Sequence, residues 1–335
     1  MKEYTIQDME GNDVLITGGL GFLGSNIANR LVTLGANVTI ATRSENKIRN
    51  IKGIEKQVKL IKGDITDKIF VKNCVKGKDI IFHLAGQTSH ITSMENPHKD
   101  IETNCIGTMN VLEACRSVND NAKIVFPGTT GQVGEIDKKN LPLKENIRDM
   151  PMTVYDADKL ASEKYLMVYN RAYGMRTVSL RLATIYGDRQ EVTSGRYGIT
   201  NMFIKRAMCN EIITVYGNGS FLRDYNYVGN VVDAFLLSSQ TEKTNGEYFN
   251  IGSNTSTKFI DMVKMIIKNV KEITGKEGVF KFVPWPENSK KIDVGDMVVD
   301  YSKFNEFTGW YPKVDLNEGI KKTVEFYKDR LDDYI

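Results

Sequence analysis

Apolar and polar residues alternate along the first half of the chain in a way that predicts short strands separated by helices. Strands are expected at six apolar runs: Val14–Thr17, Asn37–Thr42, Val58–Lys62, Asp79–Leu84, Lys123–Phe126 and Arg176–Leu182. Helices are expected where apolar residues recur near every 3.6 positions, at Phe22–Leu34, Ile101–Val118 and Tyr155–Tyr173. This order is typical of a parallel sheet with helices on both faces. We therefore expect an α/β fold with a Rossmann-type, doubly wound parallel sheet.

The pattern changes after Tyr186-Gly187, where the segments become shorter and more mixed. Further strands are expected at Ile212–Tyr216, Tyr225–Val228, Glu247–Ile251 and Val279–Val283, and helices at Asn230–Ser239, Phe259–Val270 and Leu316–Tyr327. We predict a first domain over residues 1–186 and, mainly, a smaller α+β cap over residues 187–335. The chain is expected to cross back to the first domain at about residues 225–250.

Composition narrows the class of protein. Hydrophobic residues make up 41% of the chain and charged residues 26%, as in a soluble globular protein. The net charge of +3 is nearly balanced and forms no long basic block, so no nucleic-acid partner is expected. No apolar run approaches the ~18 residues that span a bilayer, and residues 1–10 lack the pattern of a signal peptide. We expect a cytoplasmic protein with no membrane partner.

The four cysteines do not suggest a metal site. Cys74, Cys105, Cys115 and Cys209 are scattered, without a C-x-x-C spacing. Such spacing favours reduced thiols over a disulfide framework or metal ligation. No metal ligand is therefore assigned.

A glycine-rich turn follows the first predicted strand and opens the first predicted helix. Gly18, Gly21 and Gly24 stand at the spacing G-x-x-G-x-x-G. The first glycine permits the tight turn, the second lets backbone approach a pyrophosphate, and the third permits close packing of helix and strand. The helix would begin at Phe22 and Leu23, where unpaired amides favour phosphate. The first domain is therefore predicted to bind a dinucleotide.

The end of the second strand bears on the choice between NAD and NADP. An acidic residue there would bond the adenine-ribose hydroxyl of NAD. Thr42 stands at that position instead, and Arg43 follows it. An arginine can hold a 2′-phosphate through charge-assisted hydrogen bonds. The pattern favours NADP, with NAD as the alternative.

Tyr155 and Lys159 are four residues apart at the start of a predicted helix and so share one face. Tyrosine is a poor acid–base group at neutral pH, since its free pKa is about 10. A neighbouring lysine lowers that value by placing positive charge nearby. Thr129 or Thr130, after the fifth predicted strand, could donate to a substrate oxygen. These residues predict a hydride-transfer site beside the dinucleotide.

Together these features resemble the extended short-chain dehydrogenase/reductase family, and within it the nucleotide-sugar epimerases, dehydratases and decarboxylases. Further motifs that carry the resemblance are Gly63-Asp64-Ile65, His83-Leu84-Ala85-Gly86, Asn104–Thr108, Arg181–Gly187, Val215–Ser220, Arg223-Asp224-Tyr225, Tyr248–Gly252 and Gly309–Pro312. The resemblance covers almost the whole chain. It implies that Tyr155, Lys159 and Thr129 are catalytic.

The resemblance also implies binding residues that spacing alone does not reveal. Beyond the glycine turn, Thr42, Arg43, Tyr155 and Lys159, it implies cofactor contacts at Asp64, Ile65, Leu84, Ala85, Gly86 and Asn104. It implies substrate contacts at Thr130, Thr184, Arg189, Asn201, Val215, Tyr216 and Arg223. Arg223 would contact the diphosphate, and Thr184 stands where the family usually has Asn. The cap would thus bind the substrate.

One departure from the family pattern, directly after Thr129, bears on the reaction. Dehydratases of the family carry Asp-Glu after the catalytic Thr, and decarboxylases carry Glu at the second position, whereas this chain has Thr130-Gly131. Dehydration needs an acid and a base, so both reactions are disfavoured unless a displaced carboxylate such as Glu135 substitutes.

His83 is expected to be structural because it ends a buried strand. His90 is, with Glu135, the other candidate base should Tyr155 not serve.

The leading hypothesis is an epimerase of a nucleoside-diphosphate sugar, similar to UDP-glucose 4-epimerase and acting at C4. The alternative is an NADPH-dependent reductase of a nucleotide keto-sugar, which Arg43 favours. A dehydratase or decarboxylase comes third. A non-catalytic dinucleotide sensor is opposed by the intact Tyr155, Lys159 and Thr129. The resemblance implies a homodimer formed through the helices near Asn104 and Tyr155.

Overall fold

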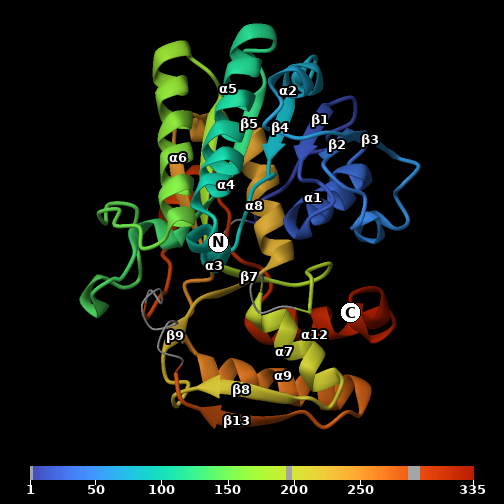
Figure 1. Cartoon of the computed structure of the whole chain (residues 1–335), viewed down its shortest axis with the longest axis vertical. Helices are drawn as coiled ribbons and strands as arrows, with labels where there is room; N and C mark the ends of the chain where they lie inside the picture. Colours follow the sequence, from blue (N-terminus) through green and yellow to red (C-terminus); the bar gives the residue numbers. More distant parts are fainter. Residues whose placement is uncertain (1–2, 194–197, 286–294) are drawn as a thin grey trace.

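A seven-stranded parallel sheet lies at the centre of the computed structural model, which describes residues 3–193, 198–285 and 295–335. Its strand order is β11-β6-β5-β4-β1-β2-β3. The five strands from β5 to β3 are labelled in Figure 1. The strands are β1 Asp13–Thr17, β2 Asn37–Thr42, β3 Val58–Lys62, β4 Ile80–His83, β5 Lys123–Thr129, β6 Thr177–Leu182 and β11 Tyr248–Ile251. The expected doubly wound α/β fold is confirmed.

Helices cover both faces of this sheet. One face packs against α1 (Phe22–Thr33), α8 (Val228–Gln240) and α11 (Ser302–Thr308). The other packs against α2 (Lys68–Val75), α5 (Gly107–Val118) and α6 (Val154–Tyr173). Successive side chains of a strand point to opposite faces. Leu15 and Ile16 of β1 are accordingly both fully buried, each in a different one of these cores.

A second group of elements forms the cap, in the lower part of Figure 1. Its strands β8 (Ile212–Tyr216) and β13 (Val279–Val283) pair in parallel. The helices α7 (Ile199–Met208), α9 (Phe259–Thr274) and α12 (Leu316–Lys328) share one apolar core with β8. Two small sheets complete the fold: β7 (Thr184–Tyr186) with β10 (Tyr225–Tyr227), and β9 (Leu222–Arg223) with β12 (Thr257–Lys258).

The chain returns from the cap to the large sheet twice. Helix α8 and strand β11 form the first return, since β11 pairs with β6. Helix α11 and Trp310 form the second. The Trp310 indole is fully buried in the same core and donates to the Asn230 carbonyl oxygen at 3.0 Å. The domain built on the large sheet is therefore completed by residues from the second half of the chain.

Several predicted boundaries differ from the structure. The helix expected at Ile101–Val118 is three segments, α4 (Pro97–Ile101), a π-helical turn (Glu102–Ile106) and α5. Strand β5 continues past Phe126 to Thr129 because its residues 124–129 pair with β6. The strand expected at Tyr225–Val228 ends one residue early, since Val228 begins α8. The helices α2, α3 (His90–Glu95) and α7 were not predicted, because short segments give weak periodicity.

Some features expected of other protein classes are missing from the part of the chain that the structure describes. No helix there is both long and apolar enough to cross a bilayer. Within the same ranges, no three side chains of His, Cys, Asp or Glu gather as a metal cluster. All four cysteines lie in these ranges as free thiols, with only Cys209 exposed.

Candidate active site

A cavity of about 1090 Å³ lies where the carboxyl ends of the sheet strands meet the cap. It is lined by the glycine turn after β1, by the ends of β5 and β6, and by residues of the cap. Ligands of open α/β sheets bind at this edge, because the strands end there and the helices begin. The position identifies the cavity as the candidate active site.

The glycine turn leaves room for a pyrophosphate. Gly18 has φ +70°, and a Cβ there would lie 2.8 Å from the Ala85 amide nitrogen. A Cβ at Gly24 would lie 2.6 Å from the Gly18 carbonyl oxygen. Gly21, Phe22 and Leu23 line the cavity, and no side chain caps the start of α1 at Gly21. The free amides of this helix start fit the phosphates of a dinucleotide.

The residues at the end of β2 and directly after it bring positive charge to the cavity. Thr42 and Arg43 line it, and the Arg43 side chain is 58% exposed. Its guanidinium lies 3.8 Å from the Asp64 carboxylate. The Glu191 carboxylate, which also lines the cavity, pairs with Lys47 at 3.2 Å. Lys47 and Arg49, for which no sequence pattern indicated a role, line the cavity as well. They come from the loop after β2, whose sequence shows no periodic pattern.

The three predicted catalytic residues meet in the cavity. Tyr155 and Lys159 lie in the first turns of α6, and Thr129 ends β5. Thr153 caps α6 by accepting a hydrogen bond from the Asp156 amide at 3.3 Å, which fixes where the helix starts. The arrangement brings a phenol, an amine and a hydroxyl from two elements to one wall.

Burial favours the neutral form of both ionisable groups. It lowers the pKa of Lys159 to about 7, and the Nζ atom lies 3.8 Å from the centroid of the Phe126 ring. Burial, together with the nearby carboxylates of Asp156 and Asp100, raises the pKa of Tyr155 above its ordinary value. Tyr155 therefore needs additional positive charge nearby before it can act as a base at neutral pH.

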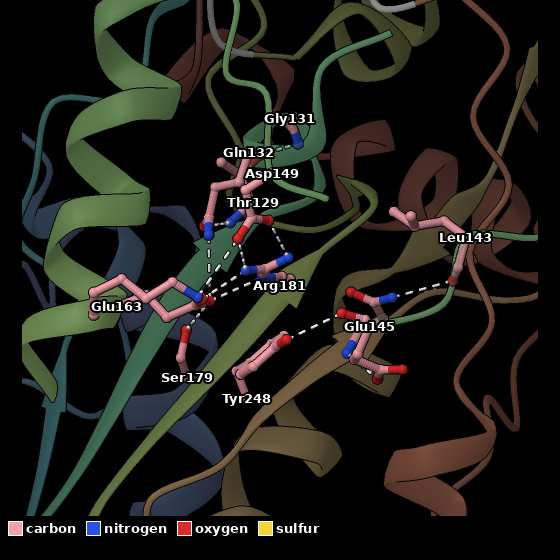
Figure 2. A network of polar contacts seen from close by, with 12 residues as sticks. Thr129, Gly131, Gln132, Leu143, Glu145, Asp149, Glu163, Ser179, Arg181 and Tyr248 are labelled. Carbon is pink, nitrogen blue, oxygen red and sulfur yellow. Dashed lines mark hydrogen bonds and ion pairs between the residues drawn. The ribbon is translucent and has the colours of Figure 1, made fainter. Parts of the chain in front are cut away.

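Thr129 is held by a buried polar network (Figure 2). Its amide donates to Gln132 Oε1 at 3.0 Å, and its hydroxyl oxygen accepts from the Gly131 amide at 3.1 Å. The Gln132 amide group donates in turn to Glu163 Oε2 at 3.3 Å. Glu163 lies on α6, four residues and about one helical turn after Lys159. The network thus couples the Thr129 turn to the helix that carries Tyr155.

Arg181 neutralises the charge of this network. Its guanidinium donates to both oxygens of Glu163, at 2.9 and 2.6 Å, and to both oxygens of Asp149, at 2.8 and 3.1 Å. Arg181 and Glu163 are almost fully buried. Burial opposes ionisation of Glu163, but hydrogen bonds from Arg181 hold the pKa of this carboxyl below its ordinary value. The sequence motif singled out Arg181 without revealing its partners, which are distant in sequence.

The structure agrees with the structural interpretation of His83. Its ring is buried between Thr17 and Thr108, with nitrogen–oxygen distances of 2.8 and 3.1 Å. Burial, aided by the charge of Lys159, lowers the pKa of His83 to about 3. Glu135 is exposed and does not line the cavity, so it is not placed to replace a missing catalytic carboxylate.

Most of the predicted binding residues line the cavity. In addition to those described above, they are Ile65, Leu84, Ala85, Gly86, Thr130, Thr184, Arg189, Tyr216 and Arg223. Arg189 is already engaged, because its guanidinium donates to Asn26 Oδ1 at 2.9 Å and to the Asn50 carbonyl oxygen at 3.1 Å. Arg223 donates to the Leu222 carbonyl oxygen at 3.0 Å. Arg189 therefore ties the cap-proximal chain to the cofactor domain.

Four predicted contacts lie behind the wall of the cavity. Val215 is fully buried in the core of the cap. The Asn201 side chain bonds both backbone groups of Gly187, at 3.1 and 2.6 Å. Asn104 similarly bonds the backbone amide and carbonyl of Gln87, each at 3.1 Å. The Asp64 carboxylate accepts from the Thr66 amide and hydroxyl, both at 3.0 Å. These side chains shape the loops that line the site.

Aromatic residues of the cap line the opposite end of the cavity. The Tyr216 and Trp285 ring centroids are 5.3 Å apart, and those of Phe221 and Trp285 are 5.5 Å apart. No sequence pattern indicated a role for Phe221 or Trp285, since they come together from separate loops. Beside Arg223, such rings offer an apolar surface for a flat group next to a cation.

Comparisons with known proteins agree with this architecture. The family model described as GDP-mannose 4,6 dehydratase matches residues 15–323. A relative named putative UDP-glucose 4-epimerase, from Methanocaldococcus jannaschii, is 33% identical over 94% of this chain and 98% of its own.

Two solved structures of UDP-glucose 4-epimerases are also similar. That from Thermotoga maritima, with UDP-glucose, has a TM-score of 0.85, 34% identity and coverage of 95% of this chain and 99% of its own. That from Thermus thermophilus, in complex with NAD, has a TM-score of 0.82, 29% identity and coverage of 95% and 99%. The chain belongs to the GDP-mannose 4,6-dehydratase family, within the nucleotide-sugar epimerases and dehydratases of the extended short-chain dehydrogenase/reductase type.

Proposed function

We propose that the chain is an epimerase of a nucleoside-diphosphate sugar that acts at C4 and uses a nicotinamide dinucleotide. The observation that carries the proposal is one continuous cavity bordered by the glycine turn, by Tyr155, Lys159 and Thr129, and by the cap. The cavity is lined both by the glycine turn, which suits a dinucleotide, and by the cap residues Tyr216, Phe221 and Arg223, which suit a nucleotide sugar. The UDP-glucose 4-epimerases among its relatives support the substrate class.

In this proposal, Tyr155, Thr129 and Lys159 move and guide the proton of the reacting hydroxyl. The nicotinamide supplies a hydride acceptor and donor. Tyr155 takes the proton of the sugar hydroxyl and later gives it back. Thr129 donates a hydrogen bond to the same oxygen and so fixes its position. Lys159 lowers the pKa of the Tyr155 phenol when its amine is charged, and Arg223 binds the diphosphate.

NADP is the cofactor that the residues after β2 favour, with NAD as the alternative. No acid ends β2, and Arg43, Lys47 and Arg49 border the place where the adenine ribose would lie. Two observations favour NAD instead. The Asp64 carboxylate lies 3.8 Å from the Arg43 guanidinium and partly neutralises its charge, and the similar structure from Thermus thermophilus is a complex with NAD. A reductase of nucleotide keto-sugars would use the same residues in one direction, and the positive charge around Arg43 favours that alternative.

The decisive experiment combines cofactor and product analysis. The purified protein is denatured and the released nucleotide identified by mass spectrometry. The native protein is then incubated with UDP-glucose, UDP-N-acetylglucosamine or UDP-glucuronic acid, and the sugars are followed by proton NMR. An epimerase forms the C4 epimer without added cofactor, whereas a reductase consumes NADPH with a keto-sugar. Tyr155→Phe serves as the inactive control, and formation of neither product would refute the proposal.

We also propose a homodimer formed through α6 and the helical segment from α4 to α5. Val168 and Tyr173 of α6 are each 56% exposed, and Ile101 and Ile106 are 42% and 47% exposed. Apolar side chains on neighbouring helices favour association through that face. Analytical ultracentrifugation of the parent and of Val168→Glu tests this: the variant should sediment as a monomer, and a monomeric parent would refute it.

A further inference from the structure

His90, the first residue of α3, is a titratable group in the cavity that the proposed reaction leaves without a role. It lines the cavity together with Tyr155 and the turn of residues 129–131. Its ring packs edge-on against the Tyr155 ring, with centroids 5.0 Å apart. The His90 side chain is 44% exposed. It can therefore meet both solvent and a bound ligand.

The partners of His90 determine which ring nitrogen carries the proton. Nδ1 lies 3.2 Å from Thr153 Oγ1 and 3.3 Å from Asp156 Oδ2. The Thr153 hydroxyl donates its single hydrogen to Asp156 Oδ2 at 2.6 Å. Thr153 Oγ1 has no hydrogen left to donate to Nδ1, and Asp156 Oδ2 has none. Both oxygens can therefore only accept a hydrogen bond from Nδ1, so Nδ1 must carry a hydrogen. The neutral ring then has its lone pair on Nε2, which has no hydrogen-bond partner among the described residues.

Asp156 is a buried anion placed directly behind this ring. Its side chain is 1% exposed, and its Oδ1 atom has no hydrogen-bond partner within the described ranges. A Cβ at Gly131 would lie 2.3 Å from that oxygen. The carboxylate fits there only because residue 131 is glycine. A carboxylate oxygen that accepts from Nδ1–H keeps the proton on that nitrogen and leaves Nε2 as the nitrogen that can accept one.

We propose that His90 is a second acid–base group of the cavity, and that Thr153 and Asp156 are its positioning residues. The inference rests on the proposed function, because the bound sugar is its proton partner. Tyr155 transfers the proton of the reacting hydroxyl, and neutral His90 accepts a different proton of the sugar. The lone pair on His90 Nε2 forms the new N–H bond. The sugar keeps the electron pair of the broken bond until the imidazolium returns the proton. No further reactant is required.

Other charged groups lie on the two helices that pack against α3. These groups are Lys99 and Asp100 of α4, and Tyr155, Asp156, Asp158 and Lys159 of α6. Lys99 pairs with Glu102 at 2.7 Å, and Asp100 bonds the side chain of Asn104 at 2.9 Å. Only Asp156 and Tyr155, of those named, have a contact with the His90 ring in the described chain. The effect of replacing Asp156 can thus be assigned to one direct partner.

The first test needs no substrate. The chain has three histidines, so imidazole nitrogen NMR resolves each, and His90→Gln assigns the signal. The parent should show His90 above pH 8 as the Nδ1–H tautomer, whereas Thr153→Val and Asp156→Asn should give a mixture of tautomers. His98, exposed on α4, is the internal control and should not change. An Nε2–H tautomer in the parent would overturn the proposal whatever the enzyme acts on.

The second test is kinetic. Turnover of the UDP-sugar that the parent epimerises is measured from pH 5 to 9 for the parent, His90→Gln and His98→Gln. Histidine changes charge in this range, so the parent should lose kcat/KM at low pH, and His98→Gln should match it. His90→Gln should lose that acidic limb and about 10²–10⁴-fold in kcat, with little change in KM.

Solvent deuterium identifies which sugar proton is involved. If His90 acts on carbon, the sugar gains a carbon-bound deuterium in D₂O with the parent and not with His90→Gln. If it acts on a hydroxyl, no deuterium is retained but the pH limb still disappears. Parental kinetics for His90→Gln would overturn the proposal, while parental kinetics for Tyr155→Phe would instead overturn the proposed function.

Discussion

Removing the Arg181 guanidinium should destabilise the fold and impair the site at once. Arg181→Met leaves the carboxylate of Glu163 buried without its bidentate partner. Three weaker donors to this carboxylate remain: Lys164 Nζ at 3.1 Å, Ser179 Oγ at 3.1 Å and Gln132 Nε2 at 3.3 Å. Breaking a buried ion pair by removing one partner costs about 3–5 kcal/mol of unfolding free energy. Because these three donors remain, we expect a loss near the lower end of that range.

The pH dependence of this loss has a defined sign. In the parent, the pKa of Glu163 is held below its ordinary value, so its contribution to stability is present above the unfolded-state value of about 4.3 and is lost as pH falls. In Arg181→Met, the buried carboxylate favours protonation instead. The variant should therefore lose more stability relative to the parent at pH 7.5 than at pH 5.

Urea unfolding followed by circular dichroism measures both effects. Glu163→Gln added to Arg181→Met should recover part of the lost stability, because it removes the unpaired buried charge. Arg116→Met is the matched control: Arg116 makes a similar pair with Glu113, at 2.9 and 2.7 Å, but on the surface. It should cost far less, since water already screens that pair. A loss below about 1 kcal/mol in Arg181→Met, or further destabilisation in the double variant, would refute the reasoning.

Three further predictions concern the site. Tyr155→Phe keeps the ring but removes the proton-carrying oxygen, so kcat should fall about 10²–10⁴-fold with folding and cofactor binding intact; near-parental turnover in steady-state assays would rule out Tyr155 as the base. Arg43→Ala should weaken NADP(H) binding roughly tenfold to a hundredfold and NAD(H) much less; equal losses in fluorescence titrations would argue against a 2′-phosphate contact. Arg223→Ala should raise KM for the nucleotide sugar and leave the cofactor Kd unchanged; calorimetry showing unaltered binding of UDP and other nucleoside diphosphates would remove this role.

The amino-acid sequence was sufficient for features that depend on local order. The alternating strands and helices predicted the parallel sheet, because period and element order are local properties. The glycine turn was recognisable because its three glycines stand at fixed spacing between a predicted strand and a predicted helix, and a Cβ at Gly24 would clash with the Gly18 carbonyl oxygen six residues earlier. Tyr155 and Lys159 were recognisable because four residues of helix place them on one face.

Tertiary structure decided everything that depends on contacts between distant segments. The Arg181–Glu163–Asp149 network joins β6, α6 and a loop that no spacing relates. Trp285 and Phe221 meet in the cap, and Asn201 and Asn104 turn out to brace loops rather than line the cavity. The tautomer of His90 is set by Thr153 and by the buried Asp156, which lie more than sixty residues further along the chain. A sequence pattern reports the period of a segment and not what folds against it, so these relations arise only when the sheet and the cap enclose the cavity.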